Sequence, residues 1–200
     1  IEINYLTQEQ PNGIAEAYII AEKFLDGSPS ILALGDNLFF GNGLQNILHS
    51  ASEDPAIATI FGYHVKDPKR YGVIGFDQNG NVISIEEKPE NPESNFAITG
   101  LYFLGSDAPA LASNMKPSER GELEITTLLE KYLADGRLKT RTMGRGIAWL
   151  DTGTHASLLE AGNFVKTLTD RQGLLVGSPD EVAIRMGLVS ANELKNKISS

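Results

Sequence analysis

The chain has 200 residues, of which 41% are apolar and 22% charged, enough to bury the core of one large domain or of one domain with an appendage. The absence of cysteine excludes disulfides and thiolate metal sites, and a net charge of −9 argues against general nucleic-acid binding, though not against a nucleotide substrate. No apolar run approaches the ~20 residues of a membrane span and no secretion leader is seen, so we expect a cytoplasmic protein.

The first part of the chain has the pattern of a strand, a helix and a second strand. The predicted strands cover residues 3–7 and 30–34, and Asn12 is the predicted N-cap of the helix between them. One face of that helix is apolar: Ile14, Tyr18, Ala21 and Leu25. Such a βαβ unit favours parallel strands, so we expect an α/β fold with a largely parallel sheet.

The middle of the chain is rich in strand patterns. The predicted elements are a short helix at 44–50 and strands at 56–63, 71–76, 82–87 and 97–104. Asn79-Gly80 lies between two of these strands and is a strong hairpin signal. We therefore expect an antiparallel hairpin set into the parallel sheet. Gly100 interrupts the last of these strands.

The later elements lead to a change of character near residue 174. A short helix from Ser106-Asp107 to Met115, a helix at 123–133, strands at 138–143 and 147–150, and a helix capped by Thr154 are predicted. Two short capped helices then follow, beginning at Ser178 and Ser190. We predict an α/β domain over residues 1–173 and a helical segment over 174–200, which is an appendage or an oligomer interface. The chain begins within a strand pattern without Met and ends within a helical pattern, so we expect it to be truncated.

Two aspartates follow buried strands and lie near glycines. Asp36 follows an apolar run and Gly35, and Asp151 follows the strand at 147–150 and precedes Gly153. Open α/β sheets bind ligands at the carboxyl ends of their strands, and Mg²⁺ prefers one or two carboxylates together with substrate phosphates. We therefore predict that Asp36 and Asp151 hold a divalent metal. The alternative is that each aspartate only caps the following segment.

Other polar residues allow two interpretations. Glu87 and Lys88, at a strand end, suit a sugar hydroxyl and a phosphate, or form a solvated charge cluster. Gln8, in a loop before a helix, has the donor and acceptor that suit a base edge, or lies on a polar surface. Arg120 either reaches a phosphate or pairs with a neighbouring glutamate. Tyr71 either lines a pocket or packs as an ordinary strand residue.

The sequence lacks the motifs of histidine metal sites, P-loop proteins and classical dehydrogenases. The three histidines share no metal-ligand spacing, and neither a P-loop lysine nor a dinucleotide-binding glycine motif is present. Arg145 lies between two glycines and fits a turn. Trp149 is predicted to be core near the site. Asn37, beside Asp36, and Trp149 are included among the expected substrate-binding residues.

Taken in order, these motifs resemble the glucose-1-phosphate thymidylyltransferases of the short, tetrameric kind that supply dTDP-rhamnose biosynthesis. The resemblance rests on the segments 10–17, 34–41, 70–73, 86–89, 97–103, 120–126 and 144–155, which read QPNGIAEA, LGDNLFFG, RYGV, EEKP, AITGLYF, RGELEIT and GRGIAWLDTGTH. It covers nearly the whole chain. It implies a Rossmann-like, three-layer nucleotidyltransferase fold, a homotetramer, and the substrates dTTP and glucose 1-phosphate with dTDP-glucose as product.

The resemblance also implies roles for individual residues. Thymine is held by Gln8, Pro11 and Gly13, and Mg²⁺ by Asp36 and Asp151. Glucose and its phosphate are surrounded by Tyr71, Gly72, Glu87, Lys88, Ile98 and Tyr102. Arg120 supports the site electrostatically, so that Asp36, Lys88, Arg120 and Asp151 form the catalytic set. A secondary site for feedback inhibition, with dTDP-rhamnose as a possible inhibitor, involves Phe40, Gly41, Arg145 and the C-terminal helices.

One motif of the family is missing from this sequence. The family begins with a glycine-rich loop of the form Gly-Gly-x-Gly-Thr-Arg that wraps the triphosphate, and the first residues here do not contain it. We therefore expect the 200-residue chain alone to be inactive. A non-catalytic module that binds a nucleotide sugar, and a uridylyl- or adenylyltransferase of the same family, are the alternative interpretations.

Overall fold

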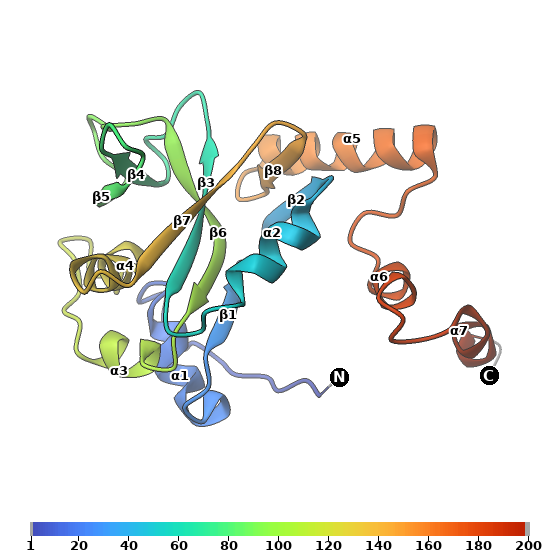
Figure 1. Cartoon of the computed structure of the whole chain (residues 1–200), viewed down its shortest axis with the longest axis horizontal. Helices are drawn as coiled ribbons and strands as arrows, with labels where there is room; N and C mark the ends of the chain where they lie inside the picture. Colours follow the sequence, from blue (N-terminus) through green and yellow to red (C-terminus); the bar gives the residue numbers. More distant parts are fainter. Residues whose placement is uncertain (1, 199–200) are drawn as a thin grey trace. The chain divides into compact units, whose positions relative to one another are not determined.

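The computed structural model (Figure 1) describes residues 2–198. The chain consists of two compact units, the first ending at Trp149 and the second beginning at Leu150. The helices are α1 (Glu16–Leu25), α2 (Leu44–Ala51), α3 (Ala108–Ser113), α4 (Ile125–Ala134), α5 (His155–Gln172), α6 (Pro179–Arg185) and α7 (Ala191–Ile198). The strands are β1 (Ser30–Ala33), β2 (Asn37–Gly41), β3 (Ala58–His64), β4 (Gly72–Phe76), β5 (Val82–Glu87), β6 (Phe96–Leu104), β7 (Leu138–Met143) and β8 (Ile147–Asp151).

The first unit is organised around strand β6, which lies in the middle of a six-stranded mixed sheet. Strand β6 runs antiparallel to β1, β3 and β4, whereas β3 and β7 pair in parallel. The β4–β5 hairpin is antiparallel, as the Asn79-Gly80 turn predicts, and Gly80 has a φ of 82°. Because the central strand runs antiparallel to its neighbours, the sheet is mixed, and antiparallel pairs outnumber the β3–β7 parallel pair among the described strands. The expected largely parallel arrangement is thus not seen in this sheet.

The side chains of β6 alternate between two apolar clusters. Tyr102 and Leu104 join the larger cluster, which contains buried residues of α1, α3 and α4. Leu101 and Phe103 join a smaller cluster, against which α2 packs. A strand covered on both faces reads as a continuous apolar run, which is why this strand is recognisable from sequence.

Strands β1 and β4 lie along the same side of β6 and leave a gap between them. Ala33 pairs with Leu101 and Val73 pairs with Ala97, so β1 ends before β4 begins. The backbone N–H of Leu34 donates to the carbonyl of Gly100 at 2.8 Å. Residues 98–100 of β6 therefore face the segments that leave β1 and enter β4, and those segments carry Asp36 and Tyr71.

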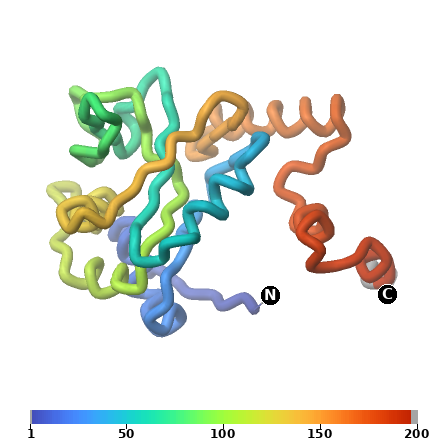
Figure 2. Tube along the Cα trace, viewed as in Figure 1, coloured from blue at the N-terminus to red at the C-terminus, as the bar shows by residue number. Residues whose placement is uncertain are grey.

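Two predictions for the first residues of the chain are wrong. Residues 3–7 form no strand and their side chains are exposed; Figure 2 shows them as an irregular segment ahead of α1. Strands need a partner for their backbone groups, and none pairs with these residues in the described part of the chain. Helix α1 begins at Glu16 with Ala15 as its N-cap, and the Asn12 side chain donates to Glu16 instead.

Strand β2 was not predicted. It begins directly after Asp36 and pairs with β8 in a separate two-stranded sheet. At Gly41 a Cβ atom would meet the backbone of Gly146 and Ile147, so only glycine fits this close approach. Pairing between segments about a hundred residues apart leaves no local signal in the sequence.

The second unit contains α5, α6 and α7. Thr154 and Ser157 form a capping box at the start of α5, and the Ser178 hydroxyl accepts the N–H of Glu181 at the start of α6. The predicted helices after residue 174 are thus present, while the compact units divide at Trp149–Leu150. The predicted domain boundary at residue 174 stays a prediction. Within the described residues, none of the helices has the length and apolarity that crossing a membrane requires.

Candidate functional site

Asn37 connects the end of β1 to the middle of β6. Its Oδ1 accepts the backbone N–H of Gly100 at 2.9 Å and the indole N–H of Trp149 at 2.5 Å, and its Nδ2 donates to Asp36 Oδ1 at 2.7 Å. The Asn37 side chain thus provides the hydrogen-bond acceptor for Gly100, a residue of β6 that pairs with neither β1 nor β4. It also places the Asp36 carboxylate and the Trp149 indole on two sides of one side chain.

The contact at Gly100 explains why glycine interrupts β6. A Cβ atom there would lie 2.6 Å from the amide carbon and from Oδ1 of Asn37. Real Cβ atoms do not approach other atoms so closely, so a side chain at this position would displace Asn37. An isolated glycine in a strand pattern often marks such a close approach.

Aromatic rings lie beside the gap. The ring centroids of Trp149 and Tyr71 are 5.2 Å apart, and those of Trp149 and Tyr63 are 5.6 Å apart in an edge-to-face arrangement. The Tyr63 hydroxyl donates to the carbonyl of Ile147 at 3.2 Å. Trp149 is buried, as the sequence predicts for core near the site. Tyr63, Tyr71 and Trp149 thus form a cluster of tilted and edge-to-face aromatic rings.

Glu87 is the last residue of β5 and contacts helix α4, and Lys88 follows it. The Thr126 hydroxyl donates to Glu87 Oε2 at 3.1 Å, and Lys88 Nζ lies 3.5 Å from Glu87 Oε1. Lys88 has a φ of 44°, and its backbone N–H donates to the carbonyl of Tyr71 at 3.0 Å. This left-handed residue turns the chain out of the strand and directs the Glu87-Lys88 pair toward the start of β4.

Arg120 is shared among three carboxylates. Its guanidinium lies 3.6 Å from Glu87, 3.2 Å from Glu122 and 3.4 Å from Glu124. Burial raises the pKa of Glu87, the negative charge of Glu124 raises it further, and Lys88, Thr126 and Arg120 oppose the shift. Arg120 therefore offsets the repulsion between the half-buried carboxylate of Glu87 and the buried carboxylate of Glu124.

Three further predicted residues form the wall beneath Glu87. A Cβ atom at Gly72 would meet Thr126 Cγ2 at 2.9 Å and Ile98 Cδ1 at 3.2 Å, which leaves no room for a side chain. Ile98 and Tyr102 are buried, with 5% and 4% of their surface exposed. Burial and the nearby carboxylate of Glu87 raise the pKa of the Tyr102 hydroxyl, so it stays protonated.

The loop that carries Gln8 is docked on the residues before α4. The N–H of Leu123 donates to the carbonyl of Asn12 at 2.6 Å, and the N–H of Ala15 donates to the carbonyl of Leu123 at 3.1 Å. Gly13, with a φ of 106°, lies directly against the Leu123 backbone, so a Cβ atom would not fit. Gln8 donates to the carbonyl of Gly13 at 3.1 Å. Pro11 is exposed in the same loop.

The remaining predicted site residues are Asp151, Phe40, Gly41 and Arg145. Asp151 belongs to the second compact unit and Asp36 to the first, so the paired metal site stays a prediction. Within the described residues, no group of three or more His, Asp or Glu side chains is arranged to hold a metal ion. Phe40 and Gly41 lie on β2, and Arg145 is exposed in the turn between β7 and β8. Their regulatory role also stays a prediction.

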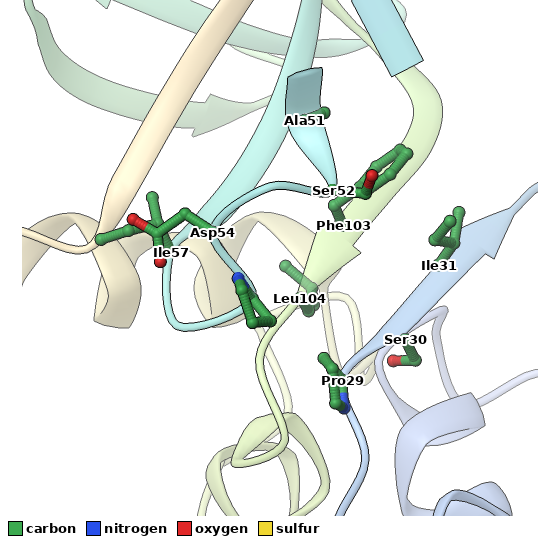
Figure 3. Close-up of a pocket in the computed structure, with 10 residues that line it drawn as sticks. Pro29, Ser30, Ile31, Ala51, Ser52, Asp54, Ile57, Phe103 and Leu104 are labelled. Carbon is green, nitrogen blue, oxygen red and sulfur yellow. The ribbon is translucent and has the colours of Figure 1, made fainter. Parts of the chain in front are cut away.

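A separate cavity of about 200 Å³ lies at the other end of β1. It is lined by Pro29, Ser30, Ile31, Ala51, Ser52, Asp54, Pro55, Ile57, Phe103 and Leu104 (Figure 3). These residues lie at the amino end of β1 and the carboxyl end of β6, whereas Asp36 follows the carboxyl end of β1. The cavity is thus distinct from the predicted site.

Sequence reasoning missed four residues that shape the site. Glu124 and Thr126 contact the Glu87 group, and Asn12 and Glu16 hold the Gln8 loop. In the sequence, Glu124 and Thr126 lie at the start of an amphipathic helix, and Asn12 and Glu16 lie beside a turn. No sequence pattern at these positions indicates the contacts.

The acidic, basic and aromatic side chains lie near strand ends of a mixed α/β sheet, and open α/β sheets bind their ligands at strand ends. A protein family described as nucleotidyl transferase matches residues 1–167. The chain belongs to the nucleotidyl transferase family, in the branch that contains the glucose-1-phosphate thymidylyltransferases.

Individual relatives support this assignment. A glucose-1-phosphate thymidylyltransferase of Xanthomonas campestris pv. campestris is 52% identical over 195 residues, which cover 98% of this chain and 66% of the relative. One of Neisseria gonorrhoeae is 46% identical over 197 residues, which cover 98% of this chain and 68% of the relative. The chain thus spans about two thirds of the length of these curated relatives.

Solved structures agree on the fold. A crystal structure of a Bacillus anthracis protein described as a glucose-1-phosphate thymidylyltransferase, in complex with a sucrose, has a TM-score of 0.68 and 35% identity; the match covers 78% of this chain and 62% of that one. A UDP-glucose pyrophosphorylase complexed with UDP-glucose has a TM-score of 0.73 at 23% identity, over 82% of this chain and 66% of that one. At that identity the likeness shows the fold alone.

Proposed function

We propose that the protein to which this chain belongs makes dTDP-glucose and pyrophosphate from dTTP and glucose 1-phosphate, as the first step of dTDP-rhamnose biosynthesis. The observation that carries the proposal is the arrangement of Glu87 and Lys88 against Tyr71 at the start of β4, with the end of β1, which leads to Asp36, farther along β6. A phosphate oxygen of the sugar phosphate bonds to the α-phosphorus of dTTP, and the bond from that phosphorus to the pyrophosphate oxygen breaks.

In this reaction the residues of the chain mainly position charge. Lys88 meets the phosphate of the sugar phosphate, while the Glu87 carboxylate, held by Thr126, accepts a hydrogen bond from a sugar hydroxyl. Trp149 and Tyr71 cover the sugar as an apolar wall. Positioning and neutralisation of the phosphoryl oxygens supply most of the catalysis in transfers of this kind.

A magnesium ion fits the donors available. Asp36 is exposed and carries one carboxylate oxygen bonded to Asn37, and Mg²⁺ is commonly held by one or two carboxylates together with substrate phosphates and water. We propose that Asp36 and Asp151 hold this ion. When bound, it supplies positive charge to the phosphoryl oxygens of the nucleotide. We also propose a homotetramer, with a regulatory nucleotide site near Phe40, Gly41 and Arg145.

The test is pyrophosphate release by the full-length gene product with glucose 1-phosphate, Mg²⁺ and one of dTTP, UTP or ATP. The proposal expects turnover, highest kcat/KM with dTTP, and a loss of at least about a hundredfold in Asp36→Asn, a range that removal of one charge-stabilising group reaches. His49→Gln, an exposed change in α2, is the control. Binding of dTDP-glucose without turnover would contradict the proposal and favour a non-catalytic binding module.

A second candidate is a uridylyltransferase. Thymine and uracil present the same hydrogen-bonding edge, so Gln8 alone does not separate them. A kcat/KM for UTP that exceeds the value for dTTP in the same assay would favour this candidate.

A further inference from the structure

The side-chain amide of Gln8 lies between two groups that only accept hydrogen bonds. Its Nε2 donates to the carbonyl of Gly13 at 3.1 Å and to Glu16 Oε2 at 2.5 Å. The other carboxylate oxygen of Glu16 accepts the side-chain N–H of Asn12 at 3.0 Å. The Glu16 carboxylate thus accepts hydrogen bonds from two side chains, Asn12 and Gln8, and the bond from Gln8 fixes the position of the Gln8 amide.

This arrangement determines which end of the Gln8 amide faces outward. An amide has a donor end and an acceptor end, and these ends exchange when the group turns by half a revolution. A carbonyl and an ionised carboxylate both require the donor end. The hydrogen bonds from Asn12 and Gln8 also lower the pKa of Glu16, so the carboxylate is ionised at neutral pH. Oε1 of Gln8 is therefore the end left to meet a ligand.

We propose that Glu16 is a positioning residue that sets base specificity by fixing the orientation of the Gln8 amide. The inference rests on the proposed function, in which Gln8 lies at the nucleotide base. An outward acceptor pairs with a base that carries a proton on its ring nitrogen beside a carbonyl. Thymine and uracil present this N3–H, whereas N3 of cytosine is an acceptor and would face Oε1 without a proton between them.

The expected discrimination is large for a single side chain. Oε1 of Gln8 is an acceptor, so a base that presents another acceptor leaves it without a hydrogen bond. Binding sites reject ligands with such a mismatch much more strongly than ligands that lack only a methyl group. The preference for thymine over cytosine is thus assigned to Glu16 acting through Gln8. No preference between thymine and uracil is assigned to it.

The experiment measures kcat/KM of the full-length gene product for dTTP, dUTP and dCTP with glucose 1-phosphate. In Glu16→Lys a donor-only side chain replaces the carboxylate and favours the turned amide, so the dTTP:dCTP ratio should fall by roughly tenfold or more. Glu16→Gln accepts either orientation, so its ratio should fall less, while the carbonyl of Gly13 still holds the amide. The dTTP:dUTP ratio should stay constant in both variants.

Glu22→Lys and Glu22→Gln are the matched controls, because Glu22 is exposed in the same helix and each control changes the charge by the same amount as the corresponding Glu16 variant. A folded Glu16→Lys protein with an unchanged dTTP:dCTP ratio would overturn the inference. So would an equal loss with all three nucleotides, which is what a purely structural role produces. A wild-type protein that uses none of the nucleotides would instead contradict the proposed function on which the inference depends.

Discussion

Gly100→Ala is a small change whose effect depends entirely on the contact between β6 and Asn37. Gly100 is buried and has no left-handed backbone conformation, so alanine is acceptable to the strand itself. Its Cβ atom would lie 2.6 Å from the Asn37 amide, and the amide has to move. The substitution therefore removes Asn37 from its position without altering any polar group.

The cost follows from the hydrogen bonds that Asn37 makes. When Oδ1 moves away, the N–H of Gly100 and the indole N–H of Trp149 both lose their acceptor. A buried donor without a partner costs about 1–3 kcal/mol, and the stiffer unfolded chain of the alanine variant offsets at most about 1 kcal/mol. We expect the free energy of unfolding to fall by roughly 2 kcal/mol or more.

Urea unfolding followed by fluorescence measures this directly, because Trp149 is the single tryptophan of the chain. Gly144→Ala is the control: it lies in the same unit, and an added Cβ atom has nothing within 4 Å. The native-state emission of Trp149 should also shift in Gly100→Ala and stay unchanged in Gly144→Ala. A loss below about 0.5 kcal/mol with unchanged emission would refute the argument, since ordinary surface changes fall in that range.

Two further predictions concern the Glu87 group and the Gln8 loop. The raised pKa of Glu87 means that the folded state keeps this proton to a higher pH than the unfolded state, so the free energy of unfolding should fall as pH rises through the window just above the ordinary glutamate pKa. Glu87→Gln should lack that fall, and urea midpoints between about pH 4 and 7 test it; parallel pH profiles of the two proteins would contradict it. Gly13→Ala should lower the free energy of unfolding by roughly 1–3 kcal/mol more than Gly80→Ala, because both glycines have positive φ but only Gly13 lies against a backbone. Equal urea midpoints in the two variants would show that the contact with Leu123 does not matter.

Local patterns predicted the elements of the first unit well. The apolar run that becomes β6, the Asn79-Gly80 hairpin and the helix predicted at 123–133 each carry their own signal, since burial on both faces, turn chemistry and helical periodicity act over a few residues. The segment at 3–7 also has a strand pattern, but no strand pairs with it among residues 2–198. A pattern states which face of a segment is apolar and not which partner covers it.

The site was less predictable because its contacts join distant segments. Asp36, Glu87 and Lys88 were predicted as site residues from their position at strand ends and from family resemblance. That Asn37 bonds Gly100 and Trp149, or that Glu124 lies beside Glu87, depends on the order of strands and on the gap between β1 and β4. Gly100 was the one local hint, and its meaning became clear only from the position of Asn37.

The central claim is that the sugar phosphate attacks the α-phosphorus of dTTP. Its most direct test supplies the full-length gene product with glucose 1-phosphate labelled with ¹⁸O in all phosphate oxygens, and analyses the products by mass spectrometry. We predict that every labelled oxygen remains in dTDP-glucose, including the oxygen that bridges the two phosphorus atoms, and that the pyrophosphate is unlabelled. Label in the pyrophosphate, or the absence of dTDP-glucose, would contradict the account.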